Sequence, residues 1–269
     1  MKNSFLIPIG LLIIIFGSFF LTFYDVNHNE LLTNEDGFFE TIGALAFLCA
    51  SILFIICWYQ SKGKGNEFRG FKTNRNLIFL GCGLLFFVAF GEEISWGQRI
   101  FNWETPEAIE KINFQQETNL HNLDGLNINL GENYDGIIGR LLVINPGRIF
   151  FYFWFTLMII IPLLNKYSLS IRNSFQRLRV PIAPLWLGAL MISNLIIAKV
   201  FIKATASYPI ETFSSIDEIM ETNYALIIAI LAIYWTRKFS YSNKANDAND
   251  ANDANSIKNS VISSYKTAK

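Results

Sequence analysis

Two adjacent carboxylates, Glu92 and Glu93, close an apolar stretch that begins near Leu77. An ionisable side chain within a membrane helix costs about 2.5–3.5 kcal/mol at the bilayer centre and less near the end of the helix, so a pair needs an explanation. Clustered carboxylates could hold a divalent cation that activates water. Alternatively, one of them could keep its proton and serve as a general acid or base.

Other acids and one histidine are expected at a similar depth. Glu40 lies in the first turns of the second apolar run, Glu221 precedes the last run, and His121 lies in the one long polar segment. Loop residues commonly carry chemistry. We therefore predict that Glu92, Glu93, His121, Glu40 and Glu221 form one catalytic site. The cofactor stays open: if a divalent cation is bound, its expected ligands are Glu92, Glu93 and His121.

Residues around the carboxylate pair are candidates for contacts with a substrate. These candidates are Trp96, Arg99, Asn122 and Lys199. On a continuous helix, Glu92, Trp96 and Arg99 would share one face. The structural alternative is that Arg99 neutralises Glu92 and Lys199 neutralises Glu93, or that Lys199 reaches the headgroups alone.

Several other acids have a purely structural explanation. Glu35 and Asp36 precede a helix, where they complement its dipole. Ser215 and Glu218 have the spacing of a capping box, which predicts that the last helix begins at Ser215. Glu117 is expected to be a surface residue of a helix lying on the membrane.

Membrane helices are the elements that would position these residues. The chain has 269 residues, of which 52% are hydrophobic and 16% charged, whereas a soluble domain carries about a quarter charged residues. The apolar residues gather in six runs, 5–23, 38–59, 77–96, 149–164, 182–202 and 224–235. The fold class is therefore predicted to be all-α, a polytopic membrane protein with six transmembrane helices in residues 1–240. The first run could instead be a signal peptide, but no small-residue cleavage pattern follows it.

The basic residues predict the orientation. Lys and Arg gather in connections 60–75 and 165–179 and after the last run, so these parts and both termini should be cytoplasmic. The acids and the segment 97–147 then face outward, and this segment should form one or two interfacial helices, the first capped by Thr105. Residues 241–269 contain an Ala-Asn-Asp repeat without an apolar face, which predicts a disordered cytoplasmic tail.

Some functions find no support in the sequence. No nucleic-acid-binding motif is present and the basic residues are divided among short loops, so nucleic acid is not an expected partner. No P-loop, G-x-G-x-x-G or G-x-S-x-G motif is present. Cys49, Cys57 and Cys82 lie in apolar runs and are expected to be small buried hydrophobes.

The stretch Phe90-Gly91-Glu92-Glu93-Ile94-Ser95-Trp96-Gly97-Gln98-Arg99, with the later Asn119-Leu120-His121-Asn122, resembles a motif set of multipass bacterial membrane proteins of unassigned function. This resemblance implies the bacterial inner (plasma) membrane but no particular activity. The carboxylate pair is also similar to part of the motif of CAAX-type glutamate intramembrane proteases, in which Glu-Glu-x-x-x-Arg is followed by His motifs. Here Arg99 comes two residues later, and the two later intramembrane His motifs are absent.

The combined prediction is a membrane-embedded enzyme, a hydrolase or transferase acting on a lipid or lipid-linked substrate at the extracytoplasmic leaflet. Its expected partners are membrane lipid and that substrate. The alternatives are a cation- or proton-coupled transporter or channel, and a membrane assembly or scaffold protein. The sequence shows no clear internal repeat, and the polar residues expected near mid-membrane are chiefly Ser193 and Asn194. Both observations favour the enzyme over the transporter.

Overall fold

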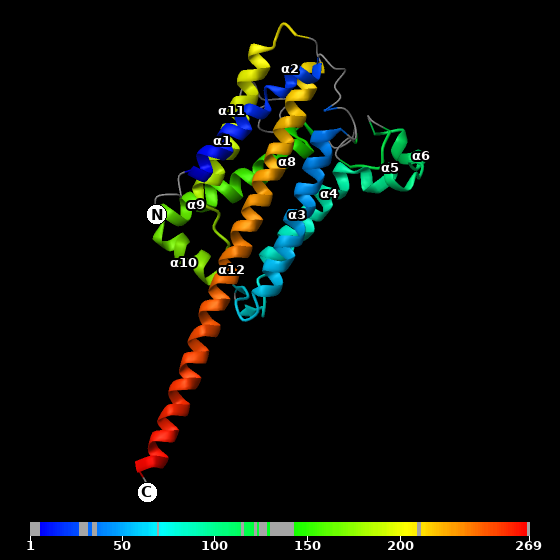
Figure 1. Ribbon diagram of the computed structural model, residues 1–269. Coiled ribbons are helices and arrows are strands. Elements are labelled where there is room, and N and C mark those ends of the chain that lie inside the picture. Colours follow the sequence, from blue (N-terminus) through cyan, green and yellow to red (C-terminus); the bar gives the residue numbers. More distant parts are fainter. Residues whose placement is uncertain are drawn as a thin grey trace.

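The computed structural model describes residues 6–26, 32–33, 37–68, 70–113, 116–120, 123, 128–129, 143–208 and 211–267. This part of the chain is mostly helical, as the sequence predicts. The helices run alongside one another between two ends, and the last helix, α12 (Glu211–Thr267), extends far beyond the others at one end (Figure 1). The N-terminal end of the first helix lies toward that same end of the bundle (Figure 1).

Four helical segments among the described residues are long and apolar enough to cross a membrane. These segments are Leu6–Tyr24, Phe38–Gln60, Pro146–Tyr167 and Leu185–Ala204. A hydrocarbon core about 30 Å thick requires about 20 helical residues, which each segment approaches or exceeds. They correspond to the first, second, fourth and fifth apolar runs, and they are the structural basis for describing the chain as a membrane protein.

The first and third of these four segments are interrupted helices. The first consists of α1 (Leu6–Ser18) and α2 (Leu21–Val26), and the second is the single helix α3 (Phe38–Gln60). The fourth-run segment is composed of α8 (Pro146–Phe155), the π-helical turn η3 (Thr156–Ile160) and α9 (Ile161–Tyr167). Pro162 explains the π turn, because it lacks the N–H for a normal helical bond and its ring crowds the preceding turn.

The helices of the third and sixth runs are not among the four that are long and apolar enough to cross a membrane. Helix α4 (Leu77–Glu93) has 17 residues, and the apolar part of α12 is preceded by acids and followed by Arg237 and Lys238. Both helices nevertheless pack along α3, and α12 also packs on α11 (Leu185–Ala204). The six-span arrangement therefore remains a prediction.

Helix α4 ends earlier than expected. Ser95 and Trp96 have φ values of 45° and 55°, in the left-handed region, where the 3₁₀ turn η1 (Ser95–Gly97) replaces the helix. The short helix α5 (Gln98–Phe101) follows in a new direction. The expectation that Glu92, Trp96 and Arg99 share one face of a continuous helix is therefore wrong.

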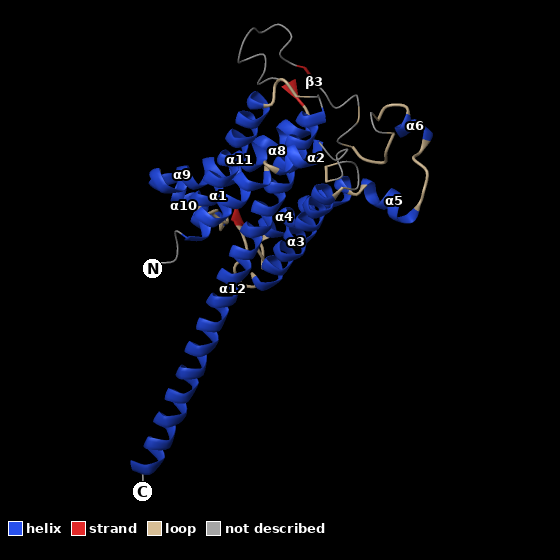
Figure 2. Ribbon diagram, turned by 45° about the horizontal axis from the view of Figure 1, so that its top comes forward, coloured by secondary structure: helices blue, strands red, loops and turns tan. Residues whose placement is uncertain are grey.

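The described part of the segment that follows contains little helix. There, α6 (Glu107–Glu110) is a single turn, and β3 (Ile128–Asn129) pairs antiparallel with β4 (Val143–Ile144). Thr105 does not cap a helix, because its hydroxyl donates to the Gln116 carbonyl at 2.7 Å. Figure 2 shows α5 and α6 to one side of the bundle, beyond the end of α4.

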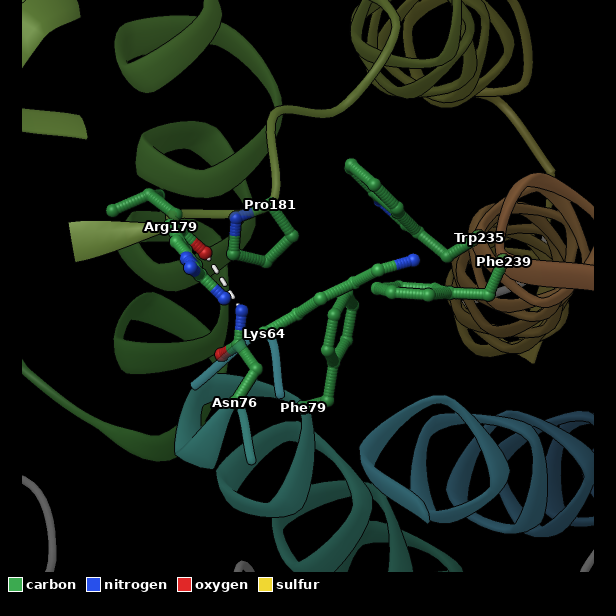
Figure 3. A pocket seen from close by; sticks show the side chains of 8 residues that line it. Lys64, Asn76, Phe79, Arg179, Pro181, Trp235 and Phe239 are labelled. Carbon is green, nitrogen blue, oxygen red and sulfur yellow. Dashed lines mark hydrogen bonds between the residues drawn. The ribbon is translucent and has the colours of Figure 1, made fainter. Parts of the chain in front are cut away.

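The two basic connections meet at the opposite end of the bundle. The first contains the hairpin of β1 (Glu67–Phe68) and β2 (Phe71–Lys72), and the second contains α10 (Leu169–Leu178). The Asn76 side chain donates to the Arg179 carbonyl at 2.7 Å (Figure 3), and Asn66 donates to the Leu178 carbonyl at 2.7 Å. These bonds satisfy the carbonyl oxygens at the end of α10. No following helical turn supplies N–H groups to them.

Helix α12 begins at Glu211, so the predicted start at Ser215 is wrong. Ser215 lies one turn inside the helix, and its hydroxyl is 2.8 Å from that of Thr33. The helical backbone continues through the Ala-Asn-Asp repeat to Thr267. The division of the chain into residues 1–240 and a disordered tail stays a prediction.

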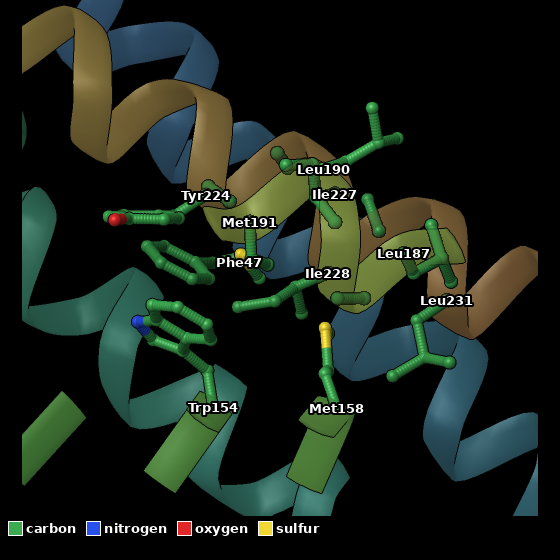
Figure 4. Packing of buried hydrophobic residues seen from close by; sticks show 14 of the residues in the cluster. Phe47, Trp154, Met158, Leu187, Leu190, Met191, Tyr224, Ile227, Ile228 and Leu231 are labelled. Carbon is green, nitrogen blue, oxygen red and sulfur yellow. The ribbon is translucent and has the colours of Figure 1, made fainter. Parts of the chain in front are cut away.

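The core lies where α3, α8, α11 and α12 face one another (Figure 4). Trp154, Met158, Leu187, Met191 and Ile228 are each at most 1% exposed. Side chains of this size bury large apolar areas and define how the helices pack. The helix ends that carry the acids therefore rest on a closely packed base.

A polar group lies within this core. Asn223 donates through its amide to the Asn194 side chain at 3.1 Å and to the Ser18 hydroxyl at 3.0 Å, and Asn194 donates to the Met220 carbonyl at 2.8 Å. The bonds connect α1, α11 and α12. In apolar surroundings such interhelical hydrogen bonds hold helices together, and each commonly contributes about 0.6 kcal/mol to stability.

Candidate functional site

Three helix ends bring carboxylates to the same end of the bundle. Glu40 lies in the first turn of α3, Glu92 and Glu93 are the last residues of α4, and Glu218 and Glu221 lie near the start of α12. Glu93 is half-buried. The charges that act on it belong to the other four carboxylates, with that of Glu221 strongest. The fold thus brings acids separated by more than 180 positions in the sequence within electrostatic range.

Glu92 has a different environment from its neighbour. One of its carboxylate oxygens accepts from the Trp96 indole N–H at 2.7 Å, and the other accepts from the backbone N–H of Leu120 at 2.6 Å. Hydrogen bonds to a charged acceptor are among the stronger ones in proteins. Glu92 therefore joins the end of α4 to a segment 28 residues later.

Ser95 and Glu117 form a second connection between these segments. The Ser95 hydroxyl donates to the Glu117 carboxylate, and the Asn119 amide donates to both, at 3.2 Å and 3.1 Å. Asn113 donates in turn to the side chain and the backbone carbonyl of Asn119, both at 2.9 Å. These four side chains are 2–8% exposed, so the interpretation of Glu117 as a surface residue is wrong.

Gln98 forms a third connection. Its side-chain oxygen accepts from the Thr118 backbone N–H at 2.7 Å, and its amide donates to the Thr105 hydroxyl at 2.7 Å. We call the network of Glu92, Ser95, Trp96, Gln98, Asn113, Glu117 and Asn119 the loop lock. It fastens residues 113–120 onto the end of α4.

Gly91 is required by the position of Trp96. A Cβ atom at residue 91 would lie 2.9 Å from two atoms of the Trp96 ring, closer than real Cβ contacts. The left-handed backbone at Ser95 and Trp96 folds this ring back over the helix. Trp96 is therefore part of the loop lock in this structure, whereas the sequence suggested a contact with substrate.

Glu218 is more than a capping residue. It lies in the second turn of α12, before the apolar part that begins near Tyr224. Burial raises the pKa of Glu218 to about 8, and the nearby carboxylates of Glu221, Glu40 and Asp217 add to this rise. A carboxyl group in such surroundings is protonated at neutral pH and can donate a hydrogen bond.

Lys199 does not lie against Glu93 as the structural alternative supposed. Its side chain is exposed on α11, and the charge on which it acts is that of Asp217. Burial raises the pKa of Asp217, and the Lys199 ammonium opposes that rise. The charge of the partner expected for Glu93 thus acts on another acid.

Some of the predicted site residues cannot be placed. His121, Asn122, Glu35 and Asp36 lie outside the described residues, as does the side chain of Arg99, whose backbone belongs to α5. Within the described part of the chain, no three His, Cys, Asp or Glu side chains are arranged to hold a metal ion. The ligand set Glu92, Glu93 and His121 includes one residue outside this part, so it stays a prediction.

Sequence reasoning missed several residues of this region. Glu117, Asn113 and Asn119 looked like ordinary polar residues of a surface segment, and Glu218 matched a capping motif. One usable signal was the concentration of amide and carboxyl side chains between positions 113 and 122. Such side chains can satisfy the backbone groups of an irregular segment that is packed down on a protein.

No model of a known protein family matches the chain, and neither the curated proteins nor the solved structures compared with it give a match. The likeness to bacterial multipass membrane proteins of unassigned function, and the partial likeness to glutamate intramembrane proteases, therefore rest on the motif residues alone.

Proposed function

We propose that this chain is a membrane-embedded enzyme, a hydrolase or transferase that acts on a lipid or lipid-linked substrate at the extracytoplasmic leaflet. In this proposal Glu93 transfers a proton during the reaction. Glu40, Glu218 and Glu221 surround it and hold protons in common with it. His121 is its expected partner from the outer segment.

The observation that carries the proposal is the different use of two adjacent acids. The two oxygens of Glu92 accept hydrogen bonds from the Trp96 indole and from the Leu120 backbone. The charges acting on Glu93 come instead from carboxylates, including those on α3 and α12. Carboxylates this close cannot all be ionised at low cost, so they share protons, as general acids and bases must.

The position of the site agrees with a substrate in the membrane. These acids lie at the ends of the helices, and the loop lock holds residues 113–120 beside them. Leu120, the residue before His121, is tied directly to Glu92. Exposed apolar side chains at this end, including Ile100, Phe101 and Trp103, are 47–72% exposed and suit contact with lipid.

Transport is the weaker alternative because of how the buried polar groups of the core are bonded. A transporter of ions needs polar groups near the midplane that can bind and release its cargo. The buried polar groups of the described core, Ser18, Asn194 and Asn223, lie at the depth of Glu221, and they already bond to one another and to the Met220 carbonyl. They serve to hold helices together, which leaves the acids at the outer end as the functional candidates.

The same proposal includes six spans with both termini cytoplasmic, in a bacterial inner membrane. Its support is that α4 and the first half of α12 run along α3, and that both basic connections meet at the end from which α12 extends (Figure 1). A reporter active only in the cytoplasm should give signal when fused after Ser170 and none after Glu110. The reverse pattern would show the topology to be inverted.

Lipid analysis of membranes provides the test of function. Wild-type protein and Glu93→Gln are expressed at equal levels in the same host, and the lipid extracts are compared by mass spectrometry. We expect wild-type protein to deplete one lipid or lipid-linked species and Glu93→Gln to leave it at the level of the empty vector. General acid–base groups typically contribute 10²–10⁴-fold to rate, so the loss should be nearly complete.

Glu107→Gln is the matched control, since Glu107 lies on the outer segment and its salt bridge with Lys111 is largely exposed. This variant should deplete the species as wild-type protein does. Depletion by Glu93→Gln at the wild-type rate would refute the role of Glu93. The absence of any lipid change with wild-type protein, together with proton flux into vesicles containing it, would favour the transporter.

A further inference from the structure

A pocket of about 330 Å³ opens at the end of the bundle opposite the carboxylates. It lies where the two basic connections approach α12 (Figure 3). The residues that line it are Lys64, Asn76, Phe79, Arg179, Val180, Pro181, Trp235 and Phe239. Two of these eight are cations and none is an acid, so the pocket suits an anion.

The cations are presented on opposite sides of an apolar base. The Arg179 guanidinium donates to the Gly63 carbonyl at 2.9 Å, which fixes its position at the rim. The Lys64 side chain crosses the pocket toward Trp235 and Phe239, with its ammonium 5.4 Å from the centre of the Phe239 ring (Figure 3). Phe79, Trp235 and Phe239 form the apolar wall.

The surroundings of the pocket are typical of the headgroup level of a membrane. The Arg75 guanidinium lies 4.9 Å from the Trp58 ring and 4.6 Å from the Tyr59 ring, and the Lys238 ammonium lies 4.5 Å from the Trp235 ring. Aromatic rings combined with basic side chains gather where helices leave the hydrocarbon core. The pocket therefore lies between the apolar part of the bundle and the basic connections.

We propose that this pocket binds the phosphate group of an anionic phospholipid from the leaflet at the basic end. Arg179 and Lys64 contact the phosphate, because a guanidinium and an ammonium are the usual protein groups for this anion. The apolar wall of Phe79, Trp235 and Phe239 contacts the adjoining acyl chains. A water-soluble phosphate compound would gain nothing from that wall, which is why a lipid is the better fit.

Titration of the purified full-length protein in detergent micelles tests the proposal. Phosphatidylglycerol or phosphatidylcholine is added, and binding is followed as the rise in melting temperature. We expect phosphatidylglycerol to bind at least about tenfold more tightly, because two basic groups each favour its net negative headgroup about fivefold, whereas the choline cation of phosphatidylcholine offsets the charge of its phosphate. Lys64→Gln and Arg179→Gln should each weaken phosphatidylglycerol binding about fivefold.

Arg177→Gln is the matched control, because Arg177 is an exposed cation of α10 that does not line the pocket. It should change binding less than about twofold. Equal binding of the two lipids, or an equal loss with Arg177→Gln, would overturn the proposal. Inorganic phosphate that competes at millimolar concentration would show that the site takes free phosphate and would overturn the lipid assignment. If Arg179→Gln lowers the melting temperature without lipid, Lys64→Gln decides the question.

Discussion

Replacing Glu92 by glutamine tests the separation of roles between the two adjacent acids. The carboxylate accepts from the Trp96 indole and from the Leu120 backbone with different oxygens. Glutamine retains one acceptor oxygen and replaces the other by an NH₂ group, so one of the two donors loses its partner. The loop lock should be weakened while its overall shape is kept.

The magnitude follows from the exposure of the two donors. A buried donor without a partner costs about 1–3 kcal/mol. Leu120 is 52% exposed, so water can replace part of what its N–H loses, and the lower half of that range applies. A loss of about 1–2 kcal/mol corresponds to roughly five- to thirtyfold more frequent opening of residues 113–120.

Hydrogen–deuterium exchange of the detergent-solubilised protein measures this opening directly. Peptides that cover residues 113–120 should exchange roughly five- to thirtyfold faster in Glu92→Gln than in wild-type protein, and peptides from the middle of α3 should be unchanged. Glu107→Gln, which breaks an exposed salt bridge on the same segment, should have little effect because such pairs contribute about 0–1 kcal/mol. The reasoning would be refuted if Glu92→Gln left exchange at 113–120 unaltered, or if Glu107→Gln accelerated it equally.

Two other substitutions address packing and protonation. Gly83→Ala places a Cβ 2.7 Å from Cγ1 of Ile55 and 3.3 Å from the Ser51 carbonyl oxygen. Thermal unfolding should therefore show a loss of about 1–3 kcal/mol in the free energy of unfolding. The control Gly81→Ala adds a Cβ that meets nothing within 4 Å, so it should leave stability unchanged or raise it. Glu218 has a pKa of about 8 against an ordinary value of 4.5, so the folded protein binds more protons than the unfolded chain between these values and loses stability as pH rises through them. Glu218→Gln should therefore have a higher melting temperature than wild-type protein, by a margin that grows from pH 5 to pH 8 and then levels off; a margin independent of pH would contradict the raised pKa.

The positions of the helices could be predicted well from the sequence. Four apolar runs correspond to helices of membrane-spanning length, because a backbone in lipid must satisfy its own hydrogen bonds and a helix does so within one segment. The same reasoning located Glu93 and Glu40 at helix ends. The uneven distribution of Lys and Arg also indicated which connections should share one end, and the contacts of Asn66 and Asn76 with the second basic connection agree with this grouping.

Local patterns predicted the helix boundaries less well. Thr105-Pro106-Glu107 and Ser215-Ile216-Asp217-Glu218 both have the form of helix starts, yet Thr105 donates to Gln116 and Ser215 lies inside α12. In both cases a contact with a distant segment uses the side chain that the motif assigns to capping. A capping bond contributes about 1 kcal/mol, which tertiary contacts can readily replace.

By itself, the sequence determined that apolar helices would carry acids near their ends, since run length and residue type depend only on neighbours along the chain. Only the tertiary structure decided which acid does what. Glu92 and Glu93 are adjacent and chemically identical, but successive helical residues point about 100° apart. One therefore faces Leu120 and the loop lock, and the other faces the acids of α3 and α12. Leu120 lies 28 residues from Glu92, and Glu40, the nearest of the acids of α3 and α12 in the sequence, lies 53 residues from Glu93. At such separations no local periodicity can specify which side chains will meet.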